Sequence, residues 1–290
     1  MTESARLAVF GEALFDCFAD QQKLGGAPFN VAWHLQAFGD APLFISRVGD
    51  DALGNQIKKA MQQWGMLTDG LQTDPGKPTG TVDITLKGGE PHYQIRDNVA
   101  YDFIDKSAIP TLRNDVIVYH GSLALRHPQN SEALTHLTQA PSVSVFVDVN
   151  LRAPWWDKET LFRWLERARW VKLNADELAE LGFQSADLLQ DMIRMQSNFQ
   201  LEQLIVTRGE KGALVRCNDG EVYEFPPSKA GKVADTVGAG DAFSAMYLHG
   251  LLQGWPITQI LPKAQAFAAA VVGLQGAFTD DAVFYQSFID

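Results

Sequence analysis

Residues 235–241 read Asp-Thr-Val-Gly-Ala-Gly-Asp, and the apolar run Ala-Phe-Ser-Ala-Met-Tyr-Leu follows at once at residues 242–248. The small residues Gly238, Ala239 and Gly240 let the backbone approach a ligand closely, and the apolar run predicts a helix that begins beside them. The first N–H groups of a helix have no partner within it, and the helix dipole adds positive charge there. The stretch therefore predicts an anion site suited to a phosphoryl group.

Asp241 lies just inside the predicted start of that helix. Its carboxylate is placed to accept a proton from a hydroxyl group held against the anion site. A base beside a phosphate site indicates phosphoryl transfer. The alternative, on these residues alone, is that Asp241 only caps the helix and the two glycines only form a turn.

A second glycine-containing stretch lies at residues 25–39 and reads Gly-Gly-Ala-Pro-Phe-Asn-Val-Ala-Trp-His-Leu-Gln-Ala-Phe-Gly. A proline follows Gly25 and Gly26 at the first helical position, and a glycine closes the predicted helix. Asn30 is the polar residue in the first turn of this otherwise apolar helix. Its carboxamide can bond a polyhydroxylated ligand that lies over the glycine turn; the alternative is an exposed Asn at a helix start.

Composition limits the class of protein. The chain has 290 residues, of which 46% are hydrophobic, so it can bury a large core. A net charge of −11 argues against a general surface for nucleic acid or anionic membranes, and any phosphate site must be local. Cys17 and Cys217 are far apart and lack metal-ligand spacing. With no long apolar segment, we expect a cytoplasmic protein without a nucleic-acid or membrane partner.

Short apolar segments alternate with segments of helical spacing. The strands expected for a sheet covered on both faces are residues 7–10, 43–48, 116–119, 143–147, 170–173 and 204–207, and a meander follows at 212–217 and 221–225. The helices expected between them are residues 55–64, 130–139, 158–168 and 176–181. This order predicts an α/β fold with a mainly parallel central sheet flanked by helices on both faces.

Residues 78–101 depart from that alternation. Residues 80–86 and 92–96 each alternate in polarity around a turn at 87–90, which predicts a hairpin. A hairpin is marginal by itself, so we expect it to pair with residues 15–20. The result would be a small β-lid formed by about 14–26 and 78–101.

Taken together, the two glycine-containing stretches resemble the two signatures of the ribokinase-like sugar kinases, also called the phosphofructokinase-B type. Shorter landmarks fall in the family's order along nearly the whole chain, at residues 11–16, 47–54, 148–152, 172–177 and 207–212. The resemblance implies one ribokinase-like domain over residues 1–290. Within the family, residues 11–16 and 121–126 look most like those of fructokinases.

The resemblance implies which residues contact the sugar. The family holds its sugar with an Asp at the position of Asp16, and the expected contacts are Asp16, Gly25, Gly26, Asn30, Arg96 and Arg152. Arg152 follows a strand end, where α/β sheets place ligands, although Val149 replaces the proline often found nearby. The alternative for Arg96 is a solvated charge on the lid.

The nucleotide side is implied in the same way. The residues expected near ATP and Mg²⁺ are Lys172, Asn174, Glu177, Thr207, Gly209 and Gly212. Asn174 and Glu177 share one side of a helical turn, where the family pair orders water around Mg²⁺; a plain helix cap is the alternative. Asp235 and Thr236 resemble positions that hold a monovalent cation such as K⁺.

The expected reaction is transfer of the γ-phosphoryl group of ATP to a primary hydroxyl of a sugar. The N–H groups of Ala239, Gly240 and Asp241 would neutralise the phosphoryl charge while Asp241 accepts the proton. Fructose is the preferred sugar, and 2-keto-3-deoxygluconate, ribose or a nucleoside are alternatives. A different class is a catalytically silent sugar- or nucleotide-binding regulator on the same fold. We expect a monomer or a homodimer.

Overall fold

A nine-stranded sheet forms the centre of the computed structural model, which describes residues 5–18, 20–87, 90–112, 115–226 and 235–289. Its strand order is β13-β12-β11-β10-β9-β8-β1-β4-β5. The strands are β1 (Leu7–Phe10), β4 (Leu43–Gly49), β5 (Leu71–Asp74), β8 (Ile117–His120), β9 (Ser144–Asp148), β10 (Trp170–Asn174), β11 (Gln203–Thr207), β12 (Ala213–Cys217) and β13 (Val222–Phe225). The run from β11 to β5 is parallel throughout, and β12 and β13 extend it antiparallel. The predicted sheet is confirmed.

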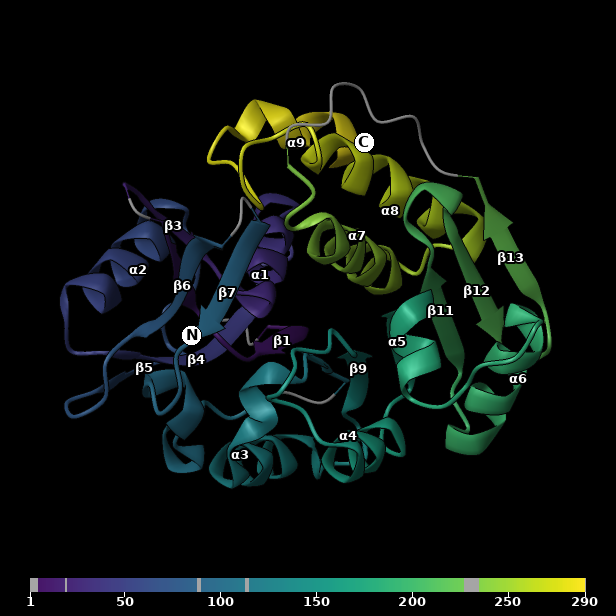
Figure 1. Cartoon of the computed structure of the whole chain (residues 1–290), viewed down its shortest axis with the longest axis horizontal. Coiled ribbons are helices and arrows are strands. Elements are labelled where there is room, and N and C mark those ends of the chain that lie inside the picture. Colours follow the sequence, from purple (N-terminus) through teal and green to yellow (C-terminus); the bar gives the residue numbers. More distant parts are fainter. Residues whose placement is uncertain (1–4, 19, 88–89, 113–114, 227–234, 290) are drawn as a thin grey trace.

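Helices cover both faces of this sheet (Figure 1). They are α1 (Ala27–Ala37), α2 (Ala52–Gln63), α3 (Pro128–Thr138), α4 (Lys158–Leu165), α5 (Ala175–Glu180), α6 (Leu188–Phe199), α7 (Ala239–Gln253), α8 (Ile257–Val271) and α9 (Ala282–Ile289). Strand β1 shows why two layers are needed, because Leu7 and Val9 belong to the core beneath α1, α7 and α8, whereas Ala8 and Phe10 belong to the core beneath α3. Alternate side chains of one strand thus pack into the cores on opposite faces of the sheet.

The lid is a second sheet of order β3-β2-β6-β7. Its strands are β2 (Leu14–Cys17), β3 (Gln22–Gly25), β6 (Gly80–Lys87) and β7 (Glu90–Ile95). The predicted hairpin is confirmed as the antiparallel pair β6 and β7, and β2 joins β6 in parallel. Residues 88–89 of the predicted turn, and residue 19 of the predicted partner segment, lie outside the described residues.

The structure contains elements that the sequence prediction left out. Strands β3 and β5 were not predicted, because Gln22, Lys23 and the polar end of β5 give no apolar alternation. Helix α6 was missed although Met192, Met195 and Phe199 are buried at helical spacing on one face.

Among the described residues, none of the helices combines the length and apolar character that a membrane crossing requires.

A buried histidine joins α1 to the C-terminal part of the chain. The side chain of His34 is fully buried, with Nδ1 3.1 Å from the hydroxyl of Tyr285 in α9 and Nε2 3.1 Å from the carbonyl oxygen of Ala277. Burial lowers the pKa of His34 to about 3. The folded protein therefore holds this ring neutral at pH values where an unfolded chain would protonate it.

This pKa sets a pH dependence of stability. The unfolded chain takes up a proton near pH 6.5 and the folded chain near pH 3, so the contribution is present above pH 6.5 and declines as pH falls between these values. H34Q should be less stable than the wild type at pH 8, and this deficit should shrink by about 2 kcal/mol at pH 5. Urea unfolding at both pH values checks it. A deficit that does not change with pH would show that His34 titrates normally in the folded state.

Candidate active site

Helix α7 begins as the sequence predicted. Gly238 is its N-cap, with a left-handed φ of 81°, and Ala239 is the first helical residue. A Cβ on Gly238 would lie 2.5 Å from the Cβ of Ala277 and 2.6 Å from its Cα, so glycine is required for two separate reasons. The first-turn N–H groups of Ala239, Gly240 and Asp241 have no acceptor within the helix, and such groups can bind an anion. That of Ala239 makes a long bond of 3.4 Å to the carbonyl oxygen of Thr236, which an anion would have to replace or share.

Asp241 is held by the second predicted helix start. Its Oδ2 accepts a hydrogen bond of 2.8 Å from Nδ2 of Asn30 in α1. The pKa of Asp241 is raised to about 6, chiefly by burial; the charge of Asp148 also raises it, whereas the Asn30 bond and the charges of Lys172 and Arg152 lower it. A carboxylate with this pKa is ionised at neutral pH and still basic enough to accept a proton.

A buried ion pair lies under the start of α7. The ammonium of Lys172 on β10 lies 2.8 and 3.0 Å from the two carboxylate oxygens of Asp148 at the end of β9. Asp148 Oδ2 also accepts hydrogen bonds from Ser244 Oγ at 2.7 Å and from the Tyr119 hydroxyl at 3.1 Å. Lys172 Nζ lies 3.5 Å from the position that a Cβ on Gly240 would take. Positive charge is thus placed directly beneath the anion site, although Lys172 is already paired.

The residues predicted to contact sugar meet at the junction of lid and sheet. Oδ2 of Asp16 on β2 lies 3.4 Å from the position of a Cβ on Gly25, and Oδ1 of Asn30 lies 4.0 Å from the same point. Gly26 has φ of 106°, and a Cβ there would lie 2.7 Å from the carbonyl oxygen of Glu12. Burial raises the pKa of Asp16, while Arg152 and Lys23 lower it.

The two predicted arginines differ in position. The exposed Arg152 lowers the pKa of Glu12, Asp16 and Asp241, so its charge lies among these three carboxyl groups. Arg96 is also exposed and follows β7. Its backbone N–H donates to the carbonyl oxygen of Thr81 at 3.0 Å, and its carbonyl oxygen accepts a 2.7 Å bond from Arg126 Nη2. The charge of Arg152 thus lies near the other expected sugar contacts, and the role of Arg96 toward the sugar stays a prediction.

Asn174 and Glu177 form a capping box at the start of α5. Asn174 Oδ1 accepts from the Glu177 N–H, and Glu177 Oε2 accepts from the Asn174 N–H, each at 2.8 Å. Glu177 Oε1 accepts a third bond of 2.8 Å from the N–H of Leu151. Burial raises the pKa of Glu177. The pair thus caps α5, as the alternative reading of these residues proposed, and its role toward Mg²⁺ stays a prediction.

The remaining predicted positions lie on turns. Thr207 ends β11, Gly209 begins a short 3₁₀ turn, η4 (Gly209–Lys211), and Gly212 follows it; the two glycines have φ of 56° and 81°. Asp235 Oδ1 accepts a 3.0 Å bond from the N–H of Val237, and the charge of Asp235 raises the pKa of Asp16. Thr236 is exposed beside it. Their roles toward ATP and K⁺ stay predictions.

Two acidic residues of this site were not predicted. Asp148 organises the buried ion pair, and Glu12, which follows β1, is 4% exposed with an Oε2 that has no partner among the described residues. Burial raises the pKa of Glu12 to about 7. Both stand at carboxyl ends of parallel strands, within the sequence landmarks at 148–152 and 11–16. Because α/β sheets place ligands at that edge, this position could have identified them as site residues.

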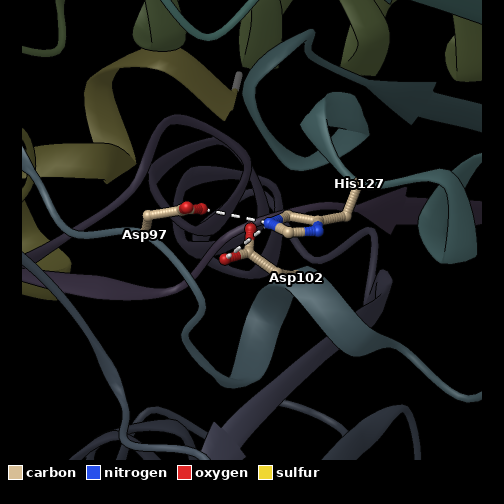
Figure 2. A group of neighbouring side chains, drawn as sticks. All are labelled: Asp97, Asp102 and His127. Carbon is tan, nitrogen blue, oxygen red and sulfur yellow. Dashed lines mark hydrogen bonds and ion pairs between the residues drawn. The ribbon is translucent and has the colours of Figure 1, made fainter.

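An ion-pair cluster lies at the base of the lid. Figure 2 shows His127 Nε2 between two carboxylates, 3.0 Å from Asp97 Oδ1 and 3.8 Å from Asp102 Oδ2. The guanidinium of Arg126 donates to both oxygens of Asp102, from Nε at 2.7 Å and from Nη2 at 2.8 Å. Because this cation already satisfies Asp102, the cluster is suited to holding the lid and not to binding a metal ion.

Comparison with known proteins places this geometry in context. The family model described as pfkB family carbohydrate kinase matches residues 3–282. Fructokinase from Escherichia coli is 31% identical over 297 residues, covering 95% of this chain and 96% of that protein. A double mutant of fructokinase from Vibrio cholerae O395, solved with fructose, ADP and potassium ion, has a TM-score of 0.86 at 26% identity over 100% of both chains. Fructokinase from Xylella fastidiosa with bound ATP has a TM-score of 0.86 at 25% identity, covering 98% of each chain. The predicted ribokinase-like fold is confirmed.

The two glycines that bound α7 give a matched test of the anion-site turn. Both have left-handed φ, but nothing lies within 4 Å of a Cβ on Gly254, whereas a Cβ on Gly238 would overlap Ala277. G254A should cost about 1 kcal/mol of unfolding free energy, and G238A about 3 kcal/mol, because strain and overpacking add. Urea unfolding of both variants measures the difference. Equal losses would contradict the close contact with Ala277.

Proposed function

The chain belongs to the pfkB family of carbohydrate kinases, and we propose that within this family it is a fructokinase that transfers the γ-phosphoryl group of ATP to fructose, forming fructose 6-phosphate. The observation that carries the proposal is the hydrogen bond between Asn30 and Asp241. It brings the polar residue of the sugar-side helix to the carboxylate of the anion-site helix. An acceptor hydroxyl beside this hydrogen-bonded pair would face both a base and the N–H groups of α7.

The chemistry of the chain's own residues follows from this placement. Asp241 takes the proton of the attacking hydroxyl, and Asn30 fixes the orientation of the carboxylate through Oδ2. The N–H groups of Ala239, Gly240 and Asp241 stabilise the charge that develops on the phosphoryl oxygens. Lys172 adds a fixed positive charge beneath them, and Asp148 holds it in place.

Two ions fit the residues present. Mg²⁺, when bound, neutralises charge on the nucleotide oxygens. Both carboxylate oxygens of Glu177 accept backbone hydrogen bonds, so this residue and the exposed Asn174 suit an ion held through water better than one bound directly. Asp235 and Thr236 would hold K⁺ near the anion site, in keeping with the potassium ion of the Vibrio cholerae fructokinase structure.

Fructose is favoured over the other sugars by the relatives. The Escherichia coli protein is a fructokinase, and the Vibrio cholerae structure contains fructose. The alternatives are 2-keto-3-deoxygluconate, ribose or a nucleoside, since acceptor identity depends on a few side chains of the lid and cleft. A catalytically silent regulator is disfavoured because Asp241 stands at the anion site with a pKa of about 6.

Replacement of the base tests the mechanism. D241N should lower kcat by at least ~10²-fold and leave the sugar KM nearly unchanged, because basicity is lost while size is kept. In the wild type, kcat/KM should fall as pH drops below about 6, since protonation of Asp241 removes the base. Steady-state kinetics from pH 5 to 8 measures both. D191N, at a buried acid on α6, is the control, and full turnover by D241N would refute the assignment.

The choice of sugar is tested separately with the purified chain, ATP and Mg²⁺. Release of ADP is measured for fructose, ribose, 2-keto-3-deoxygluconate and a purine nucleoside. We expect the highest kcat/KM for fructose, at least ~10-fold above the others, because a site that bonds several hydroxyls rejects a ligand that leaves them unpaired. A preference for another of these acceptors would keep the family assignment and overturn the fructokinase proposal.

A further inference from the structure

Four buried polar atoms near the carboxyl ends of β1 and β8 have no hydrogen-bond partner within the described part of the chain. They are Glu12 Oε2, Asn30 Oδ1, the hydroxyl of Tyr101 and Arg126 Nη1. Glu12 and Asn30 are each 4% exposed, Tyr101 is fully buried and the Arg126 side chain is 3% exposed. Each such atom costs about 1–3 kcal/mol when left unpaired. Four of them in neighbouring side chains indicate a place for a polar ligand.

Glu12 connects this group to the acceptor side of the cleft. The charges of Arg152, Asp241 and Arg126 all act on its carboxyl group. Glu12 and Arg126 in turn both act on the hydroxyl of Tyr101. The carbonyl oxygen of Glu12 also lies 2.7 Å from the position of a Cβ on Gly26, at the start of α1. Glu12 is therefore near both the Asn30 and Asp241 side of the site and the residues at the base of the lid.

Tyr101 and Arg126 are held rigidly. Tyr101 lies in η1 (Ala100–Phe103), directly behind Gly80 of β6, where a Cβ would be 2.4 Å from its ring. The Arg126 guanidinium, at the end of η3 (Leu123–Arg126), lies over the rings of Tyr101 at 5.1 Å and Trp155 at 4.6 Å. Asp102 and the carbonyl oxygen of Arg96 engage Nε and Nη2 and leave Nη1 without a partner among the described residues. Groups fixed in this way are organised before a ligand arrives.

The four atoms include both donors and acceptors. Arg126 Nη1 can only donate, Asn30 Oδ1 can only accept, and the Tyr101 hydroxyl can do either. Burial raises the pKa of Glu12 to about 7, so at neutral pH its carboxyl group occurs in both the donating and the accepting form. This mixture matches sugar hydroxyls, each of which donates one bond and accepts others.

We propose that Glu12 is a specificity-determining residue of the acceptor site, whose free carboxyl oxygen binds a sugar hydroxyl other than the one phosphorylated, with Tyr101 and Arg126 completing the same polar wall. The inference rests on the proposed sugar kinase activity. The occupant is a neutral polyhydroxylated sugar. Asp16 and Asp241 contribute two further carboxyl groups to the cleft, next to Arg152, and Glu12 adds recognition that these residues do not supply.

A coupling experiment distinguishes contact from mere support. The full chain, E12A and E12Q are assayed with ATP against fructose and its single-deoxy analogues, after circular dichroism confirms folding. E12A should raise the KM for fructose by ~10- to 10²-fold and change the KM for ATP by less than ~2-fold, and E12Q should lie between E12A and the wild type. For one deoxy analogue, kcat/KM should be at least ~10-fold lower than for fructose with the wild type, but less than ~3-fold lower than for fructose with E12A, because the variant no longer bonds the missing hydroxyl.

The inference would be overturned if the loss in kcat/KM caused by E12A or E12Q were the same for fructose and for every deoxy analogue. A residue that only supports the site would reduce kcat/KM for all of these sugars by the same factor. Y101F removes only a hydroxyl, and testing it against the same analogues gives a second comparison of variant and substrate that does not depend on E12A folding. D191N is again the control. The same cycles are measured on sugar dissociation constants by calorimetry. A wild type that binds fructose without turnover would refute the kinase proposal and leave the Glu12 coupling measurable, whereas a wild type that binds none of the sugars would overturn both.

Discussion

The ion pair between Lys172 and Asp148 is the interaction on which the rest of the site depends. It joins β10 to β9, and through Ser244 and Tyr119 it also fixes α7 and β8 to the same carboxylate. Removing two charges from water is costly, and such a pair persists only when further hydrogen bonds satisfy it. Asp148 has these bonds. The pair therefore stabilises a geometry in which a cation lies under the first turn of α7.

The same pair influences the chemistry of Asp241. The charge of Asp148 raises the pKa of Asp241 and that of Lys172 lowers it, while burial supplies the largest effect. The hydrogen bond from Asn30 then sets the direction of the carboxylate. A base of suitable strength thus results from opposing effects that come from three separate strands and helices. None of these contributions is a local property of the 235–241 segment.

Close backbone packing limits where the two helix starts can lie. Gly26 presses against the backbone of Glu12, Gly238 presses against Ala277, and both have left-handed φ. The lid is attached beside this packed region, with Tyr101 behind Gly80 and Arg126 bonded to Asp102 and to the backbone of Arg96. The two helix starts and one side of the lid are therefore held rigidly, which suits recognition of a small polar ligand.

Local sequence determined the central strands, most of the helices, the lid hairpin and both helix starts, because alternation, helical spacing, glycine and proline act over a few residues. It also placed Asp241 at the anion turn and Asp16 on the lid. Only the tertiary structure decided which charges meet. Lys172 pairs with Asp148, 24 residues away, Glu177 bonds the backbone beyond β9, and Glu12 becomes buried between lid and sheet. Strands β3 and β5 likewise form because a neighbouring strand offers hydrogen bonds to a polar segment. These outcomes depend on long-range packing and desolvation. A short stretch of sequence marks Asp148 and Glu12 as residues at strand ends but does not show which partners they meet or how deeply they are buried.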